Sequence, residues 1–317
     1  MLNEKIAVIT DGSLPTGSDL VSKVVPFYVH YQEIDVETRQ LEWRDVRGDT
    51  VSPENFVEIQ RISKKAPSTA QPSPYDFLRA YTEVIDQGYN CILVLTVPSS
   101  KSGTYNSATQ AIGLFKEHRP KEKINFVVID TGTTAAGVEY LVEEVIRLIG
   151  RGEFFIHIVE RIEYLKSRVE IFFALDKIDY ISASGRIEEL SSAKLSETLL
   201  RRAKGLAAWF ARTTHHSPKV ALSFKEGKEK LVGISRFYPQ AVVVMGQEIE
   251  QRALIGKDIK RIYLYQRGSE TETKALMGRI ALFSHAEIVV KEDLPIALLS
   301  ILGPKFVALV CIYDHMH

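Results

Sequence analysis

Uninterrupted apolar runs in the first half of the chain constrain its fold more than any other feature. The runs are IAVIT (6–10), VVPFYV (24–29), CILVLTV (91–97) and FVVID (126–130). A strand with one exposed face alternates apolar and polar residues, whereas a strand buried on both faces is continuously apolar. These runs therefore predict a largely parallel sheet with helices on both faces.

Helical spacing fills the gaps between these runs, which is typical of an α/β fold. Residues 75–85 and 107–115 carry it, and 155–166 read as a further amphipathic helix. The clearest helix spans 138–149, where apolar residues recur every three or four positions and line one face. Gly150 and Gly152 then end it.

The second half predicts a mixed α/β domain. EIFFALD, from residue 170, reads as a strand, and KVALSF and LVGISR flank the turn KEGKEK as a hairpin. Further strands are expected at IYLYQ, AEIVV and FVALVCIY, with a helix at 271–283. We place the boundary so that 1–165 form an N-terminal and 166–317 a C-terminal α/β domain, as 317 residues suit two cores.

Composition excludes several classes of function. Lys+Arg and Asp+Glu number 40 each, so no overall field attracts nucleic acid. The N-terminus reads as a first strand rather than a signal peptide, and no window has the apolar length of a spanning helix, so we expect a cytoplasmic protein without stable membrane insertion. Cys91 and Cys311 lie in apolar runs, where buried thiols are the expected state and neither a metal site nor a disulfide is predicted.

Three polar loops follow predicted strands: TDGSLP (10–15), VPSSKSGTYNSA (97–108) and DTGTTAAG (130–137). Ligands of open parallel sheets gather at the carboxyl ends of the strands. The second loop is the most specific, because its hydroxyls and flexible backbone precede a helix and suit a small anion. Those residues are Ser99, Ser100, Ser102, Gly103 and Thr104. The alternative is a Ser/Thr-rich cap that satisfies its own helix.

Residues for catalysis are poorly represented. None of the eight histidines lies in a recognisable catalytic motif, and the candidate general bases are Asp11 and Asp130. The segment PSTAQPSP (67–74) holds three prolines, so its backbone is extended and it suits neither a helix interior nor a central strand.

Taken in order, these segments resemble the DegV family of bacterial fatty-acid-binding proteins. TDGSLPTGSDL is similar to TDSTADLP, PSTAQPSPYDF to PKTSQPSPGDF and VPSSKSGTYNSA to ISSKLSGTYQSA. VVPFYV resembles the family's VPL strand, VVIDTGTTAAG resembles VIDSKSASMG, and FFALDKIDYISASGRI resembles D-L-x-Y-L-x-x-G-G-R-I. The resemblance covers roughly residues 6–187.

The resemblance implies a two-domain α/β fold that holds a long-chain fatty acid in an apolar tunnel, with hydroxyl groups on its carboxylate. The family's threonine falls on Thr69 and its serine on Ser99, or on Ser100 if one gap is allowed; Ser102, Gly103 and Thr104 shape the loop. Such a protein is not an enzyme and needs no cofactor or metal. Relatives present the bound acid to a fatty acid kinase, which is the partner the resemblance implies.

The C-terminal half departs from the family pattern. The family's H-x-G-P-G corresponds to residues 301–305, so Ile301 stands at the histidine and Lys305 at the second glycine, while Arg236 is a weak match to a basic residue. Residues 195–222 read as a helical stretch that leads into PKVAL, and PKVAL matches the family's N-I-K-P strand only in part. Two alternatives remain: an isomerase or transferase binding a small phosphorylated or carboxylated metabolite at the Ser/Thr loop, and a degenerate family member that binds no ligand and acts as an interaction protein.

Overall fold

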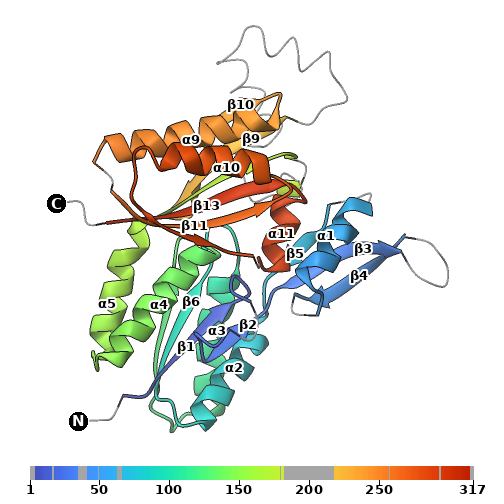
Figure 1. Cartoon of the computed structure of the whole chain (residues 1–317). Helices are drawn as coiled ribbons and strands as arrows, with labels where there is room; N and C mark the ends of the chain where they lie inside the picture. Colours follow the sequence, from blue (N-terminus) through green and yellow to red (C-terminus); the bar gives the residue numbers. More distant parts are fainter. Residues whose placement is uncertain are drawn as a thin grey trace.

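The computed structural model in Figure 1 describes residues 4–15, 18–34, 41–48, 50–62, 66–178, 180–181, 218–256, 258–292 and 294–314. Within these ranges the chain forms a four-stranded, a six-stranded and a three-stranded sheet, with helices packed between and around them. This arrangement confirms the predicted α/β class.

The four-stranded sheet is the parallel sheet predicted from the apolar runs. It contains β1 (Ile6–Asp11), β2 (Lys23–Val25), β6 (Cys91–Thr96) and β7 (Asn125–Asp130). The order is β2-β1-β6-β7, and every neighbouring pair is parallel. All four strands therefore end at the same edge, where the three polar loops begin.

Both faces of this sheet are covered, which explains its uninterrupted apolar runs. Ile92 and Val94 pack toward α2 (Pro74–Asp86) and α3 (Thr104–His118). Leu93 and Leu95, on the other face, join the cluster that contains α4 (Ala136–Gly150) and α5 (Phe155–Leu165). Burying each such side chain contributes about 1.5–3 kcal/mol.

The six-stranded sheet is mixed, as predicted for the second half. It contains β8 (Val169–Leu175), β9 (Lys219–Lys225), β10 (Lys228–Ser235), β11 (Ile259–Arg267), β12 (Glu287–Val290) and β13 (Phe306–Tyr313). The order is β10-β9-β8-β13-β11-β12, with only β11 and β12 parallel. The predicted β9–β10 hairpin is confirmed. The short 3₁₀ helix η1 (Lys166–Arg168) leads into β8.

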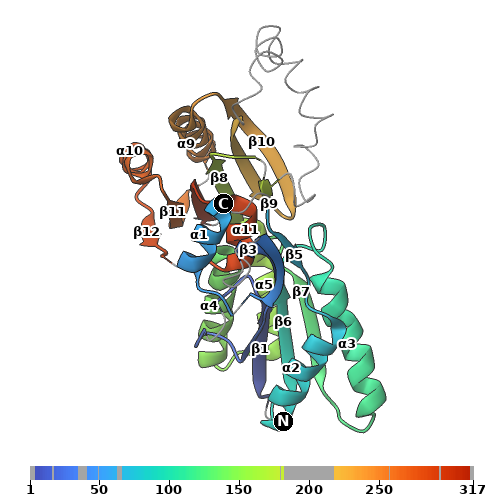
Figure 2. The ribbon, with the colours of Figure 1, turned by 90° about the vertical axis from the view of Figure 1, so that its right-hand side faces the viewer.

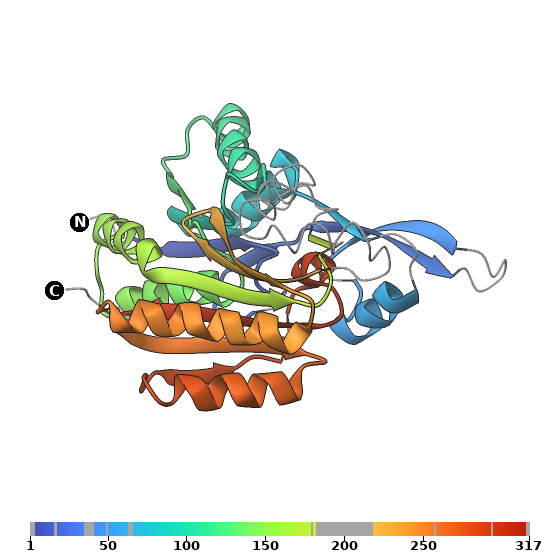
Figure 3. The same ribbon diagram turned by 90° about the horizontal axis from the view of Figure 1, so that it is seen from above.

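Helices separate and cover the two larger sheets. Seen from above in Figure 3, α9 (Tyr238–Leu254) and α10 (Glu270–Ile280) lie side by side across the six-stranded sheet. Phe172 and Ala174 of β8 face these helices, whereas Ile171 and Phe173 face the cluster shared with α4. Alternate residues of one strand therefore serve two different cores.

The three-stranded sheet was not predicted. It consists of β3 (Tyr28–Ile34), β4 (Leu41–Arg47) and β5 (Ser68–Ala70), accompanied by α1 (Pro53–Ile62) and α11 (Ile296–Leu302), as Figures 1 and 2 show. The prediction of one strand over 24–29 is wrong, because the chain leaves the parallel sheet after Val25 and enters β3 at Tyr28. Pro26 lacks an amide donor for a continuous ladder.

The proline-rich segment 67–74 becomes an edge strand followed by a helix start. In β5, Thr69 pairs with Val29 at the outside of the three-stranded sheet. Ser73 then caps α2, accepting a hydrogen bond from the amide of Asp76, while the Asp76 carboxylate accepts one from the amide of Ser73. Pro74 occupies the first turn, where no amide donor is needed.

Other predictions stand as follows. The helices predicted at 75–85, 107–115, 138–149, 155–166 and 271–283 are confirmed, with ends that differ by at most three residues. The domain boundary after residue 165 stays a prediction. Residues 195–217 of the predicted helical stretch lie outside the described residues, and its last residues enter β9.

Two kinds of feature are absent from the described residues. In the ranges given above, no helix combines the length and apolar character needed to cross a bilayer. The same ranges contain no group of three His, Cys, Asp or Glu side chains arranged for a metal ion. Cys91 and Cys311 are buried, free thiols.

Candidate functional site

Two buried or partly buried aspartates hold the three polar loops together at the carboxyl edge of the parallel sheet. Asp11 accepts hydrogen bonds from the amide of Val97 at 2.7 Å and from the amide of Ser13 at 3.0 Å. Asp130 accepts from the hydroxyl of Ser99 at 2.5 Å and from the amides of Ser99 and Gly132 at 3.0 Å. Both carboxylates are therefore committed to loop structure.

Asp11 is the more deeply buried of the two. Burial raises its pKa to about 6, against the lowering effect of the hydrogen bonds from Val97 and Ser13. The desolvation cost of the charged form exceeds the benefit of those bonds. Asp11 thus titrates within a range in which an ordinary aspartate is fully ionised.

A cavity of about 150 Å³ lies between these loops and the six-stranded sheet. Ile171, Phe173, Ala308 and Val310 form its wall on the sheet side. Leu294 and residues of α11, including Leu298, Ile301 and Leu302, form another wall.

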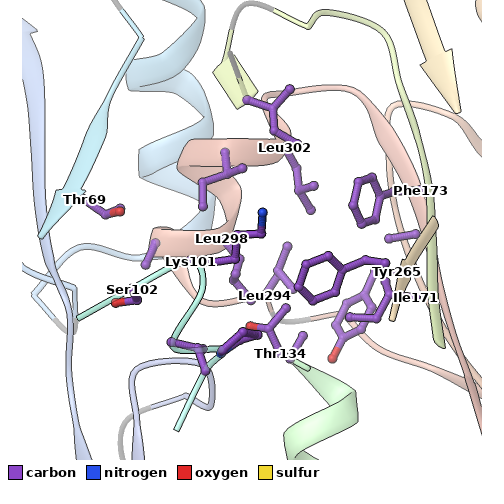
Figure 4. Close-up of a pocket in the computed structure, with 18 of the residues that line it drawn as sticks. Thr69, Lys101, Ser102, Thr134, Ile171, Phe173, Tyr265, Leu294, Leu298 and Leu302 are labelled. Atoms are coloured by element: carbon purple, nitrogen blue, oxygen red, sulfur yellow. The ribbon is translucent and has the colours of Figure 1, made fainter. Parts of the chain in front are cut away.

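Polar groups in the lining are few. They belong to Thr69 on β5, Lys101 and Ser102 on the β6–α3 loop, Thr134 before α4, and Tyr265 on β11. In the view of Figure 4, Thr69 and Ser102 lie on one side of the cavity, and Phe173 and Tyr265 lie on the other. The Oγ1 atom of Thr134 is buried and forms no hydrogen bond within the described part of the chain.

The predicted site residues divide into two groups. Thr69 and Ser102 line the cavity, although they are 33 positions apart in sequence. Ser99 turns toward Asp130, and Ser100 donates its hydroxyl to the carbonyl oxygen of Gly227 at 2.8 Å. Thr104 is fully buried, and its hydroxyl lies 2.7 Å from that of Ser102.

Gly103 has a packing role at the start of α3. A Cβ atom at this position would lie 2.2 Å from Oε1 of Gln71. The amide group of Gln71 in turn donates to Ser107 on α3 at 3.3 Å. The proline-rich segment therefore sits directly on the serine loop, which brings Thr69 to the cavity.

The tip of the β9–β10 hairpin closes the site from the second sheet. The amide of Gly227 donates to the carbonyl oxygen of Gly132 at 2.9 Å. Lys101 forms an ion pair with Glu229 of β10, and Phe224 of β9 joins the cavity lining. Residues more than 90 positions apart in sequence thus meet where the hairpin tip contacts the loops of the parallel sheet.

The residues that correspond to the family's C-terminal pattern lie in different places. Ile301 lines the cavity. Lys305 instead lies 3.4 Å from the carboxylate of Glu272 and 4.7 Å from the ring centroid of Tyr238. Arg236 stacks over the Phe237 ring at 5.5 Å and does not contribute to the lining.

Lys101, Thr134 and Tyr265 are the polar lining residues that sequence reasoning missed as site residues. Lys101 was visible as the one cation within the serine loop, and Thr134 lies in a loop attributed mainly to helix capping. Tyr265 lies in an ordinary strand pattern, so no local signal distinguished it. The bulk of α11 was also missed, because its apolar sequence lacks both a capping residue and a clear polar face.

The fold and this cavity define an α/β protein with a largely apolar cavity between its two larger sheets. The family model described as "Uncharacterised protein, DegV family" matches residues 5–314. The chain belongs to the DegV family, as the sequence resemblance predicted.

Individual relatives agree with this assignment. A DegV domain-containing protein of Clostridium acetobutylicum is 28% identical over 192 residues, which are 59% of this chain and 62% of that protein. The match therefore spans less than two thirds of the length of that curated relative.

Solved structures match over almost the whole chain. A fatty acid (stearic acid)-binding protein from Eubacterium ventriosum has a TM-score of 0.76 and 20% identity, covering 98% of both chains. The fatty acid kinase (Fak) B3 protein of Streptococcus pneumoniae, loaded with linoleic acid, has a TM-score of 0.70 and 22% identity, covering 98% of this chain and all of that one. These likenesses establish the two-domain DegV fold.

Proposed function

We propose that this protein is a non-enzymatic carrier that binds one long-chain fatty acid in the cavity between its two larger sheets. The observation that carries the proposal is a largely apolar cavity with two hydroxyl-bearing residues, Thr69 and Ser102, on one side. Such a space suits a molecule with a long apolar chain and a single polar end.

The energetics favour the acyl chain as the main source of affinity. Each buried methylene contributes about 0.8 kcal/mol, so about ten buried methylenes would contribute roughly 8 kcal/mol before the cost of association. The buried hydroxyl of Thr134 adds to this, because an unsatisfied polar group costs about 1–3 kcal/mol and a ligand oxygen would satisfy it.

The head-group assignment rests on Thr69 and Ser102 in the first place. Ser99 is part of the predicted set, but its hydroxyl is held by Asp130 at 2.5 Å and would have to leave that carboxylate to reach a ligand. Ser100, Gly103 and Thr104 enter the proposal as residues that shape the loop, through their contacts to Gly227, Gln71 and Ser102.

Presentation of the acid to a fatty acid kinase and a cytoplasmic location complete the proposal. They rest on family membership and on the likeness to a protein whose name refers to such a kinase. The enzymatic alternative lacks support at the site, because the two candidate bases, Asp11 and Asp130, bind loop amides and do not line the cavity. The open cavity also speaks against a degenerate, non-binding protein.

Native mass spectrometry of the purified protein tests the proposal. We expect a mass increment equal to one long-chain fatty acid, and a smaller lipid-bound fraction in the double variant Thr69→Val/Ser102→Ala, which loses two hydroxyls at the head group. Thr109→Val, which removes an exposed hydroxyl bonded within α3, is the matched control and should retain the lipid. Ser99→Ala should also retain it. Wild-type protein that neither carries nor takes up a fatty acid would overturn the proposal.

A further inference from the structure

A charged side chain, that of Lys101, reaches the cavity. Among the described residues that form the lining, Lys101 alone carries a formal charge. Figure 4 places its nitrogen among the lining side chains, with Thr69 and Ser102 on one side in that view and Phe173 and Tyr265 on the other. Its side chain is only 18% exposed.

Lys101 is neutralised from the opposite sheet. Its ion-pair partner Glu229 lies on β10 and is 7% exposed. Both charges have lost most of their hydration beside an apolar space. A pair in such surroundings is often no more stabilising than two apolar side chains of similar size, because desolvation offsets the attraction. Stability alone is therefore a weak reason for a lysine at this position.

A ligand with a negative end supplies a better reason. A carboxylate taken into an apolar cavity loses its hydration, and only a cation or several strong donors compensate for that loss. Thr69 and Ser102 offer neutral hydroxyls, whereas the Lys101 ammonium has three N–H donors and accommodates more than one acceptor. Charge-assisted hydrogen bonds are also roughly twice as strong as neutral ones.

We propose that Lys101 is the residue that selects an acid head group in this cavity, and that Glu229 is an internal competitor which the ligand carboxylate displaces, wholly or in part, from the ammonium group. This inference rests on the proposed function and adds to it the chemical basis of head-group selection. In the empty site Lys101 and Glu229 form a closed ion pair between the β6–α3 loop and the β9–β10 hairpin, and in the occupied site two carboxylates compete for the one ammonium group.

Competition between an acid and its alcohol measures this selection directly. Delipidated protein is incubated with an equimolar mixture of oleic acid and oleyl alcohol, which share one chain, and native mass spectrometry gives the ratio of the two bound species. Lys101→Met keeps the length of the side chain without its charge, and we expect the acid-to-alcohol ratio to fall about tenfold to a hundredfold. Glu229→Gln removes the competitor, and we expect the ratio to rise at least threefold.

Lys219→Met is the matched control. Lys219 is also 18% exposed and pairs with Asp176 at 3.0 Å, but it lies outside the cavity lining. The acid-to-alcohol ratio bound by Lys219→Met should equal that of the wild type.

A wild-type ratio in Lys101→Met, or an equal loss of acid and alcohol, would assign Lys101 a purely structural role and overturn the inference while the carrier function stands. A fall of the ratio in Glu229→Gln would overturn it as well. Wild-type protein that binds neither compound would defeat the proposed function itself, and this inference with it.

Discussion

The hydroxyl of Ser100 donates to the carbonyl oxygen of Gly227 at 2.8 Å, although 127 positions separate the two residues in sequence. This bond joins the loop after β6, in the parallel sheet, to the turn between β9 and β10, in the mixed sheet. It lies beside the Lys101–Glu229 ion pair and the contact between Gly227 and Gly132. The hairpin tip is thus the point at which the second sheet closes on the loops of the first.

Ser100→Ala tests the contribution of this bond. We expect the free energy of unfolding to fall by about 1 kcal/mol, and bound fatty acid to dissociate faster, because the hairpin tip loses one anchor. Urea denaturation and the rate of lipid transfer to vesicles are the measurements. Ser167→Ala removes an exposed hydroxyl that donates to a carbonyl oxygen three positions away, and it should change neither quantity.

Gly132→Ala should weaken the same contact through the backbone. Gly132 has a φ of +65°, and a Cβ atom there would lie 2.9 Å from the Cα atom of Glu226 in the hairpin turn. Left-handed backbone costs an alanine about 1–2 kcal/mol, and the clash adds to this, so we expect a loss of at least about 2 kcal/mol in urea denaturation.

Gly150→Ala provides the comparison for that experiment. Gly150 ends α4, and no atom from outside the surrounding helical backbone lies within 4 Å of the position that a Cβ atom would take there. Alanine should be neutral or stabilising there by up to about 1 kcal/mol. Equal effects of the two substitutions would contradict the close approach of the hairpin to Gly132.

Ala308→Phe should fill the cavity. Ala308 lies on β13 with its side chain in the lining, opposite Phe173 of β8 and Tyr265 of β11. The added ring occupies space that the acyl chain would need, so we expect lipid binding to be lost while the melting temperature of the lipid-free protein is kept within a few degrees. Native mass spectrometry and calorimetry measure the two effects.

Ala174→Phe separates blocking from general damage. Ala174 is fully buried on the other face of β8, against α9. Overpacking there should cost about 1–3 kcal/mol or more. Loss of stability in Ala308→Phe as large as in Ala174→Phe would show that the cavity is not open in solution.

Asp11 predicts a defined pH dependence of stability. Burial raises its folded-state pKa from 3.8 to about 6, so the folded protein binds more protons than the unfolded chain between these values. The free energy of unfolding therefore falls as pH rises from about 4 to about 6, by up to about 3 kcal/mol from this group. Urea denaturation across pH 4–7 should reveal this fall in the wild type, and Asp11→Asn should lack it.

Asp86 gives the opposite sign. A hydrogen bond from Arg119 lowers the pKa of this exposed carboxyl, so its contribution to stability is present above its unfolded-state pKa and is lost as pH falls. The difference in free energy of unfolding between wild type and Asp86→Asn should therefore decrease as pH falls. The corresponding difference for Asp11→Asn should decrease as pH rises. Parallel pH profiles for wild type and Asp11→Asn would contradict the raised pKa of Asp11.

Local sequence was enough to identify the elements of the two larger sheets except β2, which was merged with the start of β3. The uninterrupted apolar run Cys91–Thr96 reflects a strand that is buried along its whole length. The helical spacing of apolar residues from Val138 to Ile149 reflects a helix that is buried along one face. The order of motifs also identified the family, and with it Thr69 and the loop that contains Ser102. These features depend on side-chain type and short-range period, both of which are visible in the letters of the chain.

Tertiary structure decided which of several equivalent groups face the cavity. Ser99, Ser100 and Ser102 are the same residue type within four positions, yet the hydroxyl of Ser99 binds Asp130, that of Ser100 binds Gly227, and only Ser102 of the three lines the cavity, with its hydroxyl beside that of Thr104. The three-stranded sheet, the wall formed by α11 and the pairing of Lys101 with Glu229 likewise depend on contacts between distant segments. A side chain's direction follows from loop backbone angles and long-range partners, and no local pattern encodes either.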